Sequence, residues 1–422
     1  MSTGTRGRRV FCPDSRVGWN FNVCRVTDQI VRMSVFSALA LTALLAAPIR
    51  ADEVALTAPQ KLLVDVGARG VFDPSVTEDP ETRRLWMSYS AFDVSSNSQS
   101  GVNLRIASSD DGDTWRDVGV VQRFTDVVVG PLAAVTDAGE LYVEEGSLGT
   151  WQNGTSTLVY DNHAPRDQRW KLFWHQALWV NDVPRYASYS WIALKTADSP
   201  ENLVHARPIK LFTGYMARTT GESAAAPAVS PIPGPPAIQL DKMNSQLGAC
   251  MFGQPAALSA PDGLYLAIDC AWLGTRALLH TVLLRCGYPG CVATDAAAWT
   301  VAGRLTEPRD GPQLDEQYLG LGGTALAEKG GHYYLIATPI TADNRYDGCN
   351  VYRFADLAYG KLERRRGKLV VAQTVGGIPA THHGACAAHS RLQGGILLSQ
   401  IVSTAAPRVM QIRRSGTELP RD

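Results

Sequence analysis

From residue 52 onward, short apolar runs alternate with chain-breaking residues. The runs are rich in Val, Leu, Tyr, Trp and Thr, and they are separated by Gly, Pro, Asp and Asn. Long segments with apolar residues at every third or fourth position, which are typical of amphipathic helices, do not occur. This pattern predicts an all-β domain. The breaker-rich stretch Thr219–Pro236 predicts a loop or internal linker within it.

A weak internal repeat organises the expected strands. A segment of small residues or proline is followed by a turn and then by an aromatic or apolar strand. The pairs are Gly70–Val76 with Arg84–Tyr89, Val129–Val135 with Glu140–Val143, Phe252–Leu258 with Asp262–Ala267, Gly322–Leu326 with His332–Ile336, and His383–Ala388 with Gly394–Leu398; Tyr160–Pro165 with Trp170–Trp174 is a further candidate. Small residues suit the inner strand of a propeller blade, and an aromatic strand suits its middle. A spacing of roughly 60 to 90 residues predicts a five-bladed β-propeller, with six blades as the alternative.

An apolar run at residues 35–47 marks a processing signal near the N-terminus. A run of about 13 residues is too short to span a bilayer and has the size of a signal-peptide core. We therefore predict a signal peptide at residues 33–51 and a secreted or periplasmic propeller domain at residues 52–422. Residues 1–32 are expected to be a non-native or disordered extension. A membrane anchor is the alternative for the apolar run, and no membrane span is expected in the mature chain.

Charge and cysteine content narrow the expected partners and location. The chain has 40 basic and 40 acidic side chains. A nucleic-acid or anionic membrane partner would normally select a basic excess, so we expect no nucleic-acid partner. We also expect a monomer. Six of the eight cysteines follow residue 51, and an even number in an exported chain indicates disulfides. A bridge between Cys286 and Cys291 could close a tight loop; the other pairings stay open, and zinc is the alternative.

The segment Ser108–Trp115 fits the Asp-box pattern, Ser-x-Asp-x-Gly-x-Thr-Trp. This pattern predicts a hairpin turn between outer strands of a blade. We expect Asp110 to bond the main chain of the turn, Gly112 to adopt a positive φ, and Trp115 to pack beneath. The motif has a structural role and supplies no catalytic group.

The segment Gly70–Tyr89 resembles the first blade of five-bladed glycoside hydrolases, namely family 43 arabinanases and xylosidases and their invertase and levansucrase relatives. An Asp-Pro pair begins the inner strand in that group, and Asp73-Pro74 matches it here. The resemblance implies that Asp73 is the catalytic base or nucleophile. The group places a second Asp and a Glu in later inner strands, where this chain has Gly130-Pro131 and Gln254-Pro255. Sialidases also carry Asp boxes, but they begin with Arg-Ile-Pro in the strand where this chain has Phe72-Asp73-Pro74.

Glycoside cleavage requires two carboxyl groups that face each other across the bond to be broken. Asp73 is the first candidate, and its alternative role is to cap a turn before proline. Glu145 follows the strand at residues 141–143, Asp161 lies beside a Trp-rich strand, and Glu316 precedes the strand at residues 318–326. One of these three is expected to be the general acid; a solvated strand end or loop is the alternative for each.

Aromatic and histidine side chains supply candidate binding groups. Flat indole faces can stack on sugars, and Trp151 and Trp174 belong to a group of five tryptophans within about forty residues. Packing between blades is the alternative for most of them. His383 is a candidate substrate-binding residue. No cofactor is required for glycoside cleavage of this kind, and the resemblance implies that a structural ion could lie in the channel, near His382, His383 or His389.

These features favour an exported glycoside hydrolase-like protein that acts on a glycan through paired carboxylates in the propeller channel. The alternative is a non-catalytic, lectin-like propeller that binds carbohydrate without cleaving it. The number of carboxylates at the channel mouth distinguishes the two hypotheses. Motifs for nucleotide binding or for serine or cysteine nucleophiles do not occur in the sequence.

Overall fold

The structure is a computed structural model that describes residues 61–63 and most of residues 70–420. The gaps between these limits lie at 64–69, 94–100, 130–131, 137–138, 144–145, 181–182, 185–189, 214–231, 233–237, 245–246, 248–249, 273–274, 342–344, 377–382, 393–394 and 404–408. The predicted extension, the signal peptide, Glu145 and His382 lie outside the described residues.

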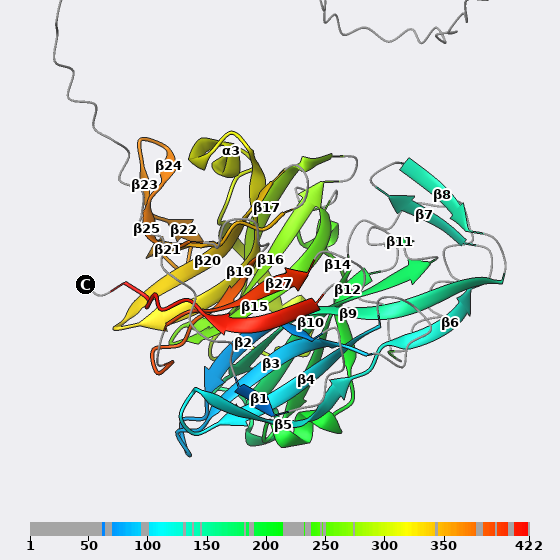
Figure 1. Cartoon of the computed structure of the whole chain (residues 1–422), viewed down its shortest axis with the longest axis horizontal. Coiled ribbons are helices and arrows are strands. Elements are labelled where there is room, and N and C mark those ends of the chain that lie inside the picture. Colours follow the sequence, from blue (N-terminus) through cyan, green and yellow to red (C-terminus); the bar gives the residue numbers. More distant parts are fainter. Residues whose placement is uncertain are drawn as a thin grey trace, which may run out of the picture. The chain divides into compact units, whose positions relative to one another are not determined.

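Strands dominate the described residues, as the alternating pattern predicts, and five sheets have three or more strands (Figure 1). Sheet 1 contains β2 (Val71–Glu78), β3 (Leu85–Phe92), β4 (Val102–Ser109), β5 (Thr114–Gln122) and β1 (Lys61–Leu63). Sheet 2 contains β9 (Ser147–Tyr160), β10 (Trp170–Val180), β12 (Ser190–Ala197), β13 (Ile209–Thr213), β14 (Ile238–Gln239), β6 (Thr125–Val129) and β11 (Val183–Pro184).

The remaining sheets follow in chain order. Sheet 3 contains β15 (Cys250–Ala260), β16 (Gly263–Trp272), β17 (Thr275–Gly287) and β18 (Trp299–Arg304). Sheet 4 contains β19 (Tyr318–Lys329), β20 (His332–Thr341), β21 (Cys349–Asp356), β22 (Lys361–Leu362) and β25 (Val371–Val375). Sheet 5 contains β26 (His383–Ala387), β27 (Leu397–Ser403) and β28 (Val409–Arg414).

Two strand pairs and a few short helices complete the described structure. The pairs are β7 (Leu132–Thr136) with β8 (Gly139–Val143), and β23 (Arg364–Arg365) with β24 (Lys368–Leu369). The α-helices are α2 (Leu240–Met243) and α3 (Asp310–Leu314), and three-residue or four-residue 3₁₀ turns occur at Arg166–Gln168, Glu201–Val204 and Ala296–Ala298. None of the described helices is long and apolar enough to cross a membrane.

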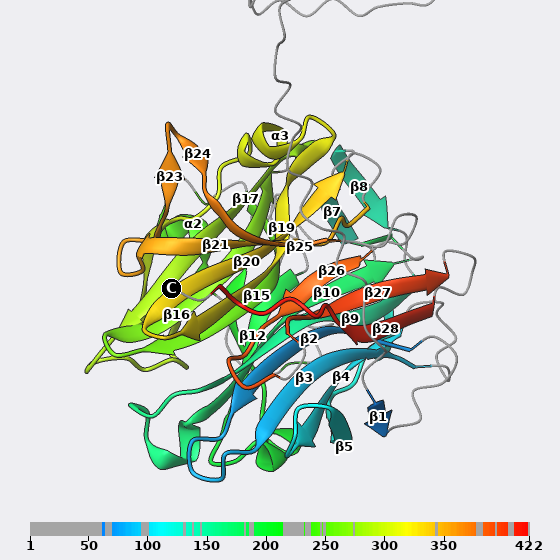
Figure 2. The ribbon, with the colours of Figure 1, turned by 60° about the vertical axis from the view of Figure 1, so that its left-hand side comes forward.

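The innermost strands of the five sheets close a ring, and each pairs with the strand that is second from the centre in its own sheet. β2 contacts β9, β9 contacts β15, β15 contacts β19, β19 contacts β26, and β26 contacts β2 again. Figure 2 shows these strands toward the middle, with β3, β4 and β5 of sheet 1 and β27 and β28 of sheet 5 outside them. This is a β-propeller arrangement, and it confirms the all-β propeller prediction. Five sheets agree with the expected five blades, but the blade number of the whole chain stays a prediction.

A separate hydrophobic cluster fills each junction between neighbouring sheets. Trp86 of sheet 1 and Trp170 of sheet 2 belong to one cluster, for example, and Phe173 of sheet 2 packs with Trp299 of sheet 3 in the next. Three further clusters join sheets 3 and 4, sheets 4 and 5, and sheets 5 and 1. The apolar faces of the strands are therefore buried between sheets, which stabilises the ring chiefly by removing apolar area from water.

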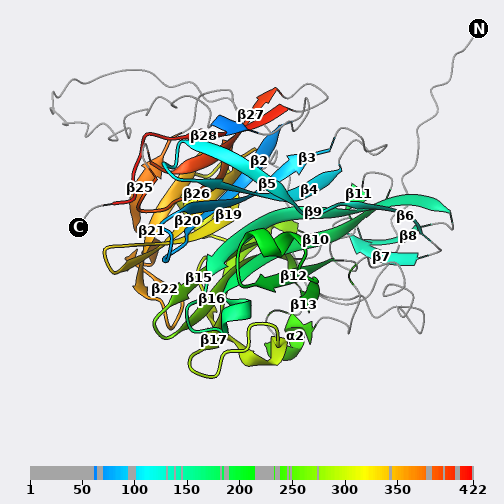
Figure 3. The same cartoon turned by 90° about the horizontal axis from the view of Figure 1, so that it is seen from below.

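The prediction for the second inner strand is wrong. The segment at residues 129–143 supplies β7 and β8, which pair only with each other and lie to one side in Figures 1 and 3. The inner strand of sheet 2 is instead the long strand β9, which ends at Tyr160 and is paired with β10. In the further candidate pair, Tyr160–Pro165 is therefore mostly the turn that follows the inner strand, and Trp170–Trp174 begins β10. The sequence pattern of strand, turn and strand is the same in both places, because a hairpin apart from the ring needs the same turn as one within it.

The turn at Ser108–Trp115 has the predicted shape, with one correction. Gly112 has a φ of +73°, and Trp115 is fully buried. The side chain that bonds the main chain is that of Asp111, which accepts hydrogen bonds from the N–H groups of Asp113 and Thr114 at 2.8 and 2.9 Å. Asp110, for which this role was predicted, is exposed and pairs with Arg84.

Two disulfides are placed between described cysteines. Cys286 and Cys291 are bonded, which confirms the predicted loop closure. Cys349 and Cys386 are also bonded, so β21 of sheet 4 is covalently joined to β26, the first strand of sheet 5. This second pairing could not be read from the sequence, because the partners are 37 residues apart and meet only when sheets 4 and 5 pack together.

Candidate active site in the central channel

All five innermost strands carry an irregularity at the same level of the ring. Their register with the second strand shifts after Phe72 in β2, after Gly253 in β15, after Gly322 in β19 and after Gly384 in β26. In β9 the shift lies at residues 154–155. Extra residues of this kind form β-bulges, which redirect side chains and are common beside active sites.

The bulge places one residue of four strands in the left-handed region of backbone space. The φ angles are 52° at Asp73, 49° at Gln254, 59° at Gly323 and 47° at Ala385. A positive φ is uncommon for residues other than glycine and costs of order 1 kcal/mol or more. The neighbouring sheets must therefore hold Asp73, Gln254 and Ala385 in this conformation.

A small cavity lies at the centre of the ring beside these bulges. Its lining includes Asp73 of sheet 1, Thr155 and Thr157 of sheet 2, Pro255 of sheet 3, Thr324 of sheet 4 and Ala385 of sheet 5. The cavity volume of about 20 Å³ is room for roughly one water molecule and is too small for a sugar ring.

Both the main chain and the side chain of Asp73 are hydrogen-bonded. Its main-chain N–H donates a 2.7 Å hydrogen bond to the hydroxyl of Ser399, and its Oδ2 accepts a 2.9 Å hydrogen bond from the hydroxyl of Thr155. Burial raises the pKa of its carboxyl to about 6, and the Thr155 bond opposes this rise. A carboxyl with a pKa near 6 can accept or release a proton close to neutral pH, as a catalytic base must.

None of the other described bulges carries a carboxylate. The residues equivalent to Asp73 are Gly323 and Ala385 in sheets 4 and 5, Gln254 in sheet 3, and Gly154-Thr155 in sheet 2. The Oε1 atom of Gln254 lies 3.5 Å from the point that a β-carbon on Gly323 would occupy. Gln254 thus places a neutral amide, which is both donor and acceptor, at the position where Asp73 has a carboxylate.

Asp269 in β16 is a second buried carboxyl at this level of the ring. It is only 4% exposed, and it accepts hydrogen bonds from the hydroxyl of Thr281 at 3.0 Å, the N–H of Gly323 at 2.8 Å and the hydroxyl of Thr324 at 3.3 Å. Burial raises its pKa to about 7, although these hydrogen bonds act in the opposite direction. Sequence reasoning missed this residue; an aspartate inside the otherwise apolar strand at residues 263–272 was the available signal.

An exposed carboxylate, that of Asp347, lies beside the first residue of β26. Asp347 forms an isolated parallel bridge with His383, and its Oδ2 accepts a 2.5 Å hydrogen bond from the hydroxyl of Tyr318. His383 in turn lies two residues before the bulge residue Ala385. Burial and Asp347 together raise the pKa of the Tyr318 hydroxyl well above its ordinary value, so this tyrosine stays a hydrogen-bond donor. Asp347 was also missed from the sequence, because only sheet pairing brings it to β26.

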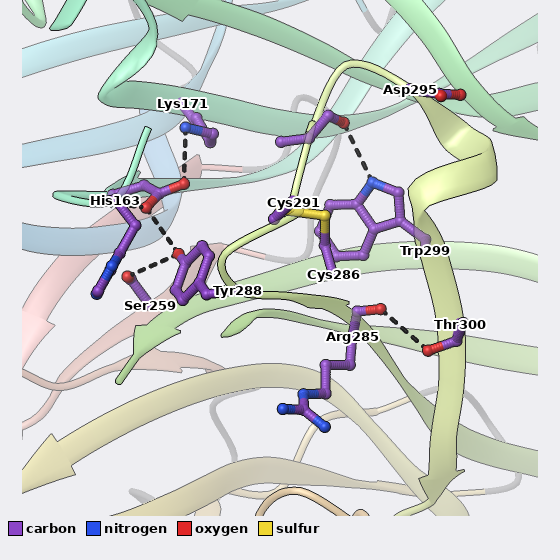
Figure 4. The surroundings of a disulfide bond; sticks show 12 residues. His163, Lys171, Ser259, Arg285, Cys286, Tyr288, Cys291, Asp295, Trp299 and Thr300 are labelled. Carbon is purple, nitrogen blue, oxygen red and sulfur yellow. Dashed lines mark hydrogen bonds and ion pairs between the residues drawn. A yellow bond between two sulfur atoms is a disulfide. The ribbon is translucent and has the colours of Figure 1, made fainter. Parts of the chain in front are cut away.

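Asp161 lies in a structural network between sheets 2 and 3. It is 1% exposed, forms an ion pair with Lys171 at 3.0 Å, and accepts a 2.7 Å hydrogen bond from Tyr288. Figure 4 shows Lys171, Tyr288 and Ser259 of this network beside the loop that the Cys286–Cys291 bridge closes. Asp161 follows the bulge of β9 by six residues, about 20 Å along an extended strand, and it does not line the described cavity.

The other two candidate acids are not brought to the cavity in the described part of the chain. Glu316 is exposed in the turn between α3 and β19, and Glu145 lies outside the described residues. Of the three predicted catalytic carboxylates that the structure describes, Asp73 alone lines the cavity. The catalytic roles themselves stay predictions.

The predicted substrate-binding tryptophans lie in the hydrophobic core. Trp151 and Trp174 are fully buried in the cluster between sheets 1 and 2, and Trp151 stacks on Trp191 with ring centroids 4.6 Å apart. Neither indole face is therefore open to a sugar in this conformation, and packing between sheets, the alternative considered from the sequence, accounts for both. His383 is 2% exposed at the start of β26, next to the bulge.

No group of three or more His, Cys, Asp or Glu side chains that could hold a metal ion occurs among the described residues. Nε2 of His389 lies 4.0 Å from Oε2 of Glu78. Burial lowers the pKa of His389, and the charge of Glu78 acts in the opposite direction. The structural channel ion that the sequence suggested stays a prediction.

Comparison with known proteins gave matches among solved structures only; no family model and no curated protein sequence matched the chain. A thermostable family-43 glycoside hydrolase matches with 12% identity and a TM-score of 0.43, covering 85% of this chain and 92% of its own. The GH43 endo-arabinanase from Bacillus licheniformis matches with 12% identity and a TM-score of 0.45, covering 84% and 94%.

A GH32 β-fructofuranosidase from Bombyx mori also matches, with 12% identity and a TM-score of 0.41. The match covers 80% of this chain but only 56% of the fructofuranosidase, so this chain spans about half the length of that enzyme. At these identities and TM-scores the similarity carries no weight for function. The proposal below therefore depends on the residues of this chain.

Proposed function

We propose that the chain is a glycoside hydrolase-like protein with Asp73 as base or nucleophile. It would act on a glycan at the end of the propeller channel where the innermost strands begin. The observation that carries this proposal is the position of Asp73. It is the one carboxylate at the described bulges, it lines the central cavity, and burial raises its pKa to about 6. A strained backbone that aims an ionisable group into a channel is typical of functional sites.

A second carboxylate must protonate the leaving oxygen. We propose Asp347 for this role, because it forms a bridge with His383, the first residue of β26, and β26 contacts the strand β2 that carries Asp73. Its Tyr318 partner orients it. Asp161 is less suited, since it is buried in an ion pair with Lys171. Glu145 and Glu316, the acids that the sequence suggested, stay alternatives for which the described residues provide no contact with the cavity.

The experiment compares the wild type with Asp73→Asn and Asp347→Asn on aryl glycosides and plant or microbial polysaccharides. Asn keeps the shape of the side chain and removes the charge. We expect both variants to lose turnover by at least about two orders of magnitude, as the loss of an acid or base usually causes. Retention of full activity by Asp73→Asn, or a wild type inert on the whole panel, would refute the proposal. Full activity in Asp347→Asn alone would return the search for the acid to Glu145 and Glu316.

A lectin-like binding protein is the second candidate, and Gln254 is the observation that favours it. A neutral amide at the equivalent of the Asp73 position can hold sugar hydroxyls without donating a proton to a leaving group. If the wild type binds a glycan by calorimetry but releases no sugar, and if Asp73→Asn binds equally well, this candidate replaces the hydrolase.

The same proposal includes export. The chain would enter an oxidising compartment as a monomer and bind its glycan there. Its support is the pair of disulfides, Cys286–Cys291 and Cys349–Cys386, because disulfides persist mainly outside the reducing cytosol. Determination of the N-terminal residue of the native protein tests the predicted cleavage near residue 51, and size-exclusion chromatography with light scattering tests the monomer.

A further inference from the structure

One hydrogen bond recurs at three junctions of the ring. In each case a side chain on the second strand of one sheet accepts the main-chain N–H of the bulge residue in the next sheet. Asp269 accepts from Gly323 at 2.8 Å, Thr338 accepts from Ala385 at 2.9 Å, and Ser399 accepts from Asp73 at 2.7 Å. The three acceptors are 4%, 0% and 3% exposed, respectively.

The three acceptors hold equivalent places in their sheets. Asp269 is paired with Gly253, Thr338 with Gly322, and Ser399 with Gly384, and each of these glycines comes directly before the bulge of its own sheet. The same level of the propeller therefore supplies the acceptor each time. Chance contacts would not keep one register position across three sheets, so the bond is a repeated element of the fold.

The bond has a clear physical role. A bulge removes an N–H group from the strand ladder, and a buried N–H without an acceptor is costly. The bulge residues also have positive φ, a conformation that persists only where the surroundings hold it. A buried acceptor from the preceding sheet satisfies the N–H and fixes the direction in which the bulge residue projects its side chain.

Only one of the three held residues carries an ionisable side chain. Gly323 and Ala385 project no polar group, whereas Asp73 projects the carboxylate that lines the cavity. We infer that Ser399 is a positioning residue for Asp73: its hydroxyl holds the main chain so that the carboxylate points into the channel and reaches the hydroxyl of Thr155. This inference takes the role of Asp73 from the proposed function, but its structural part can be tested without activity.

Removal of the Ser399 hydroxyl has an expected signature. In Ser399→Ala, the N–H of Asp73 loses its acceptor, the bulge relaxes, and the carboxylate moves away from Thr155. Since the Thr155 bond lowers the pKa of Asp73 against the effect of burial, the pKa should rise above its wild-type value. Burial is the largest cause of the raised pKa and the Thr155 bond is the opposing one, so the titration reports both the burial and the hydrogen bond of this carboxylate.

The test uses the full chain and three variants. Ser399→Ala removes the acceptor. Ser399→Thr keeps a hydroxyl, and a threonine is accommodated at the equivalent position, residue 338, of sheet 4. Thr338→Val is the matched control, because it removes the same bond at a neighbouring junction whose bulge residue is Ala385. The Asp73 carboxyl is titrated by ¹³C NMR, and thermal unfolding is measured in parallel.

We expect Ser399→Ala to raise the Asp73 pKa by at least about half a unit, with Ser399→Thr close to the wild type. Thr338→Val should lose comparable stability but leave the titration unchanged. If Ser399→Ala and Thr338→Val both destabilise the fold and neither moves the titration, Ser399 is only structural and the inference is overturned. Ser399→Cys, with a weak acceptor of similar size, replaces the alanine variant if that variant does not fold.

Activity separates this inference from the proposed function. In an active wild type, Ser399→Ala should lower kcat by about ten-fold or more with little change in KM, and the acidic limb of the pH profile should move with the titration. An inert wild type in which Ser399→Ala still moves the Asp73 titration refutes the hydrolase and leaves the positioning role intact. An active wild type in which Ser399→Ala leaves the Asp73 titration unchanged supports the hydrolase and refutes the positioning role.

Discussion

The hydroxyl of Thr155 in β9 donates a 2.9 Å hydrogen bond to Oδ2 of Asp73 in β2, across the junction between sheets 1 and 2. This bond lowers the pKa of Asp73 while burial raises it, and the two effects together give a value of about 6. Thr155, on the inner strand of sheet 2, thus lowers the pKa of the carboxylate that sheet 1 places beside the cavity.

The first prediction is that Thr155→Val raises the pKa of Asp73 above about 6. Valine keeps the shape and removes the donor. If Asp73 acts as a base, the acidic limb of the pH–activity profile should move to higher pH, with activity at pH 5 falling more than at pH 8. The control is Thr157→Val in the same cavity, which removes a bond to the N–H of Ala257 instead. An acidic limb that stays in place in Thr155→Val contradicts the prediction.

The second prediction concerns Asp269 and the dependence of stability on pH. Its pKa is raised from 3.8 to about 7 in the folded chain, so between these pH values the folded state binds a proton that the unfolded state releases. The contribution of Asp269 to stability therefore falls as pH rises from about 4 to about 7. Asp269→Asn should remove this contribution, while its amide oxygen can still accept the N–H of Gly323.

Urea unfolding at pH 5 and pH 8 measures this effect. The loss of stability between the two values should be smaller in Asp269→Asn than in the wild type. Asp347→Asn, in which an exposed carboxylate is changed, should follow the wild type. Equal pH dependence in Asp269→Asn and the wild type would show that the buried carboxyl is already ionised at pH 5.

The third prediction is that the Cys349–Cys386 bridge stabilises the ring more than the Cys286–Cys291 bridge. The first joins two sheets across 37 residues, and the second closes a loop within 5 residues. By loop-closure entropy the removal of the longer bridge costs about 4 kcal/mol and that of the shorter about 2 kcal/mol. Chemical denaturation of Cys349→Ser with Cys386→Ser, against Cys286→Ser with Cys291→Ser, tests this order. The reverse order would show that the packing of sheets 4 and 5 already holds the ring closed.

The fourth prediction is that Asp161→Asn lowers the stability of the fold more than it lowers turnover. The substitution leaves the ammonium of Lys171, which is only 1% exposed, without its counter-ion, and breaking a buried ion pair from one side costs about 3–5 kcal/mol. Lys171→Met should be similarly destabilising, although Lys171 also bonds the carbonyl of Gln168. Guanidinium unfolding and turnover are measured on the same samples. Normal stability with a large loss of turnover in Asp161→Asn would instead identify Asp161 as the general acid.

The sequence predicts the features of this fold that are set by local chemistry. Asp73 stands on an inner strand beside the channel, Cys286 is bonded to Cys291, Gly112 has a positive φ, and Trp115 is buried, as expected. The bridge, the positive φ and the buried Trp115 each depend on residues within one turn or one strand pair, whereas the place of Asp73 was implied by the resemblance of Gly70–Tyr89 to a propeller blade. The signal in the sequence and the interaction in the structure therefore involve the same few positions.

Features that depend on contact between sheets could not be predicted in this way. Asp269 and Ser399 act on the next sheet of the ring, and sequence order does not say which register position meets a neighbouring bulge. Trp151 and Trp174 show the same limit, because an aromatic ring that stacks on a sugar and one that fills a sheet junction give the same pattern. Only burial in the folded ring separates the two roles.

The last prediction concerns Gln254, the residue at the bulge of sheet 3. Gln254→Glu adds a carboxylate of the same shape at the position equivalent to Asp73. If the wild type is a hydrolase whose acid lies at the channel mouth, the new charge adds a second carboxylate at the bulges of the inner strands and raises the pKa of Asp73, because like charges disfavour ionisation. We therefore expect lower activity at pH 5 to 6 and a recovery at higher pH. Gln254→Ala, which removes the amide without adding charge, controls for lost substrate contacts. A gain of hydrolysis in Gln254→Glu would have the opposite meaning: the glutamate would supply the missing acid, and the wild type would be the glycan-binding protein.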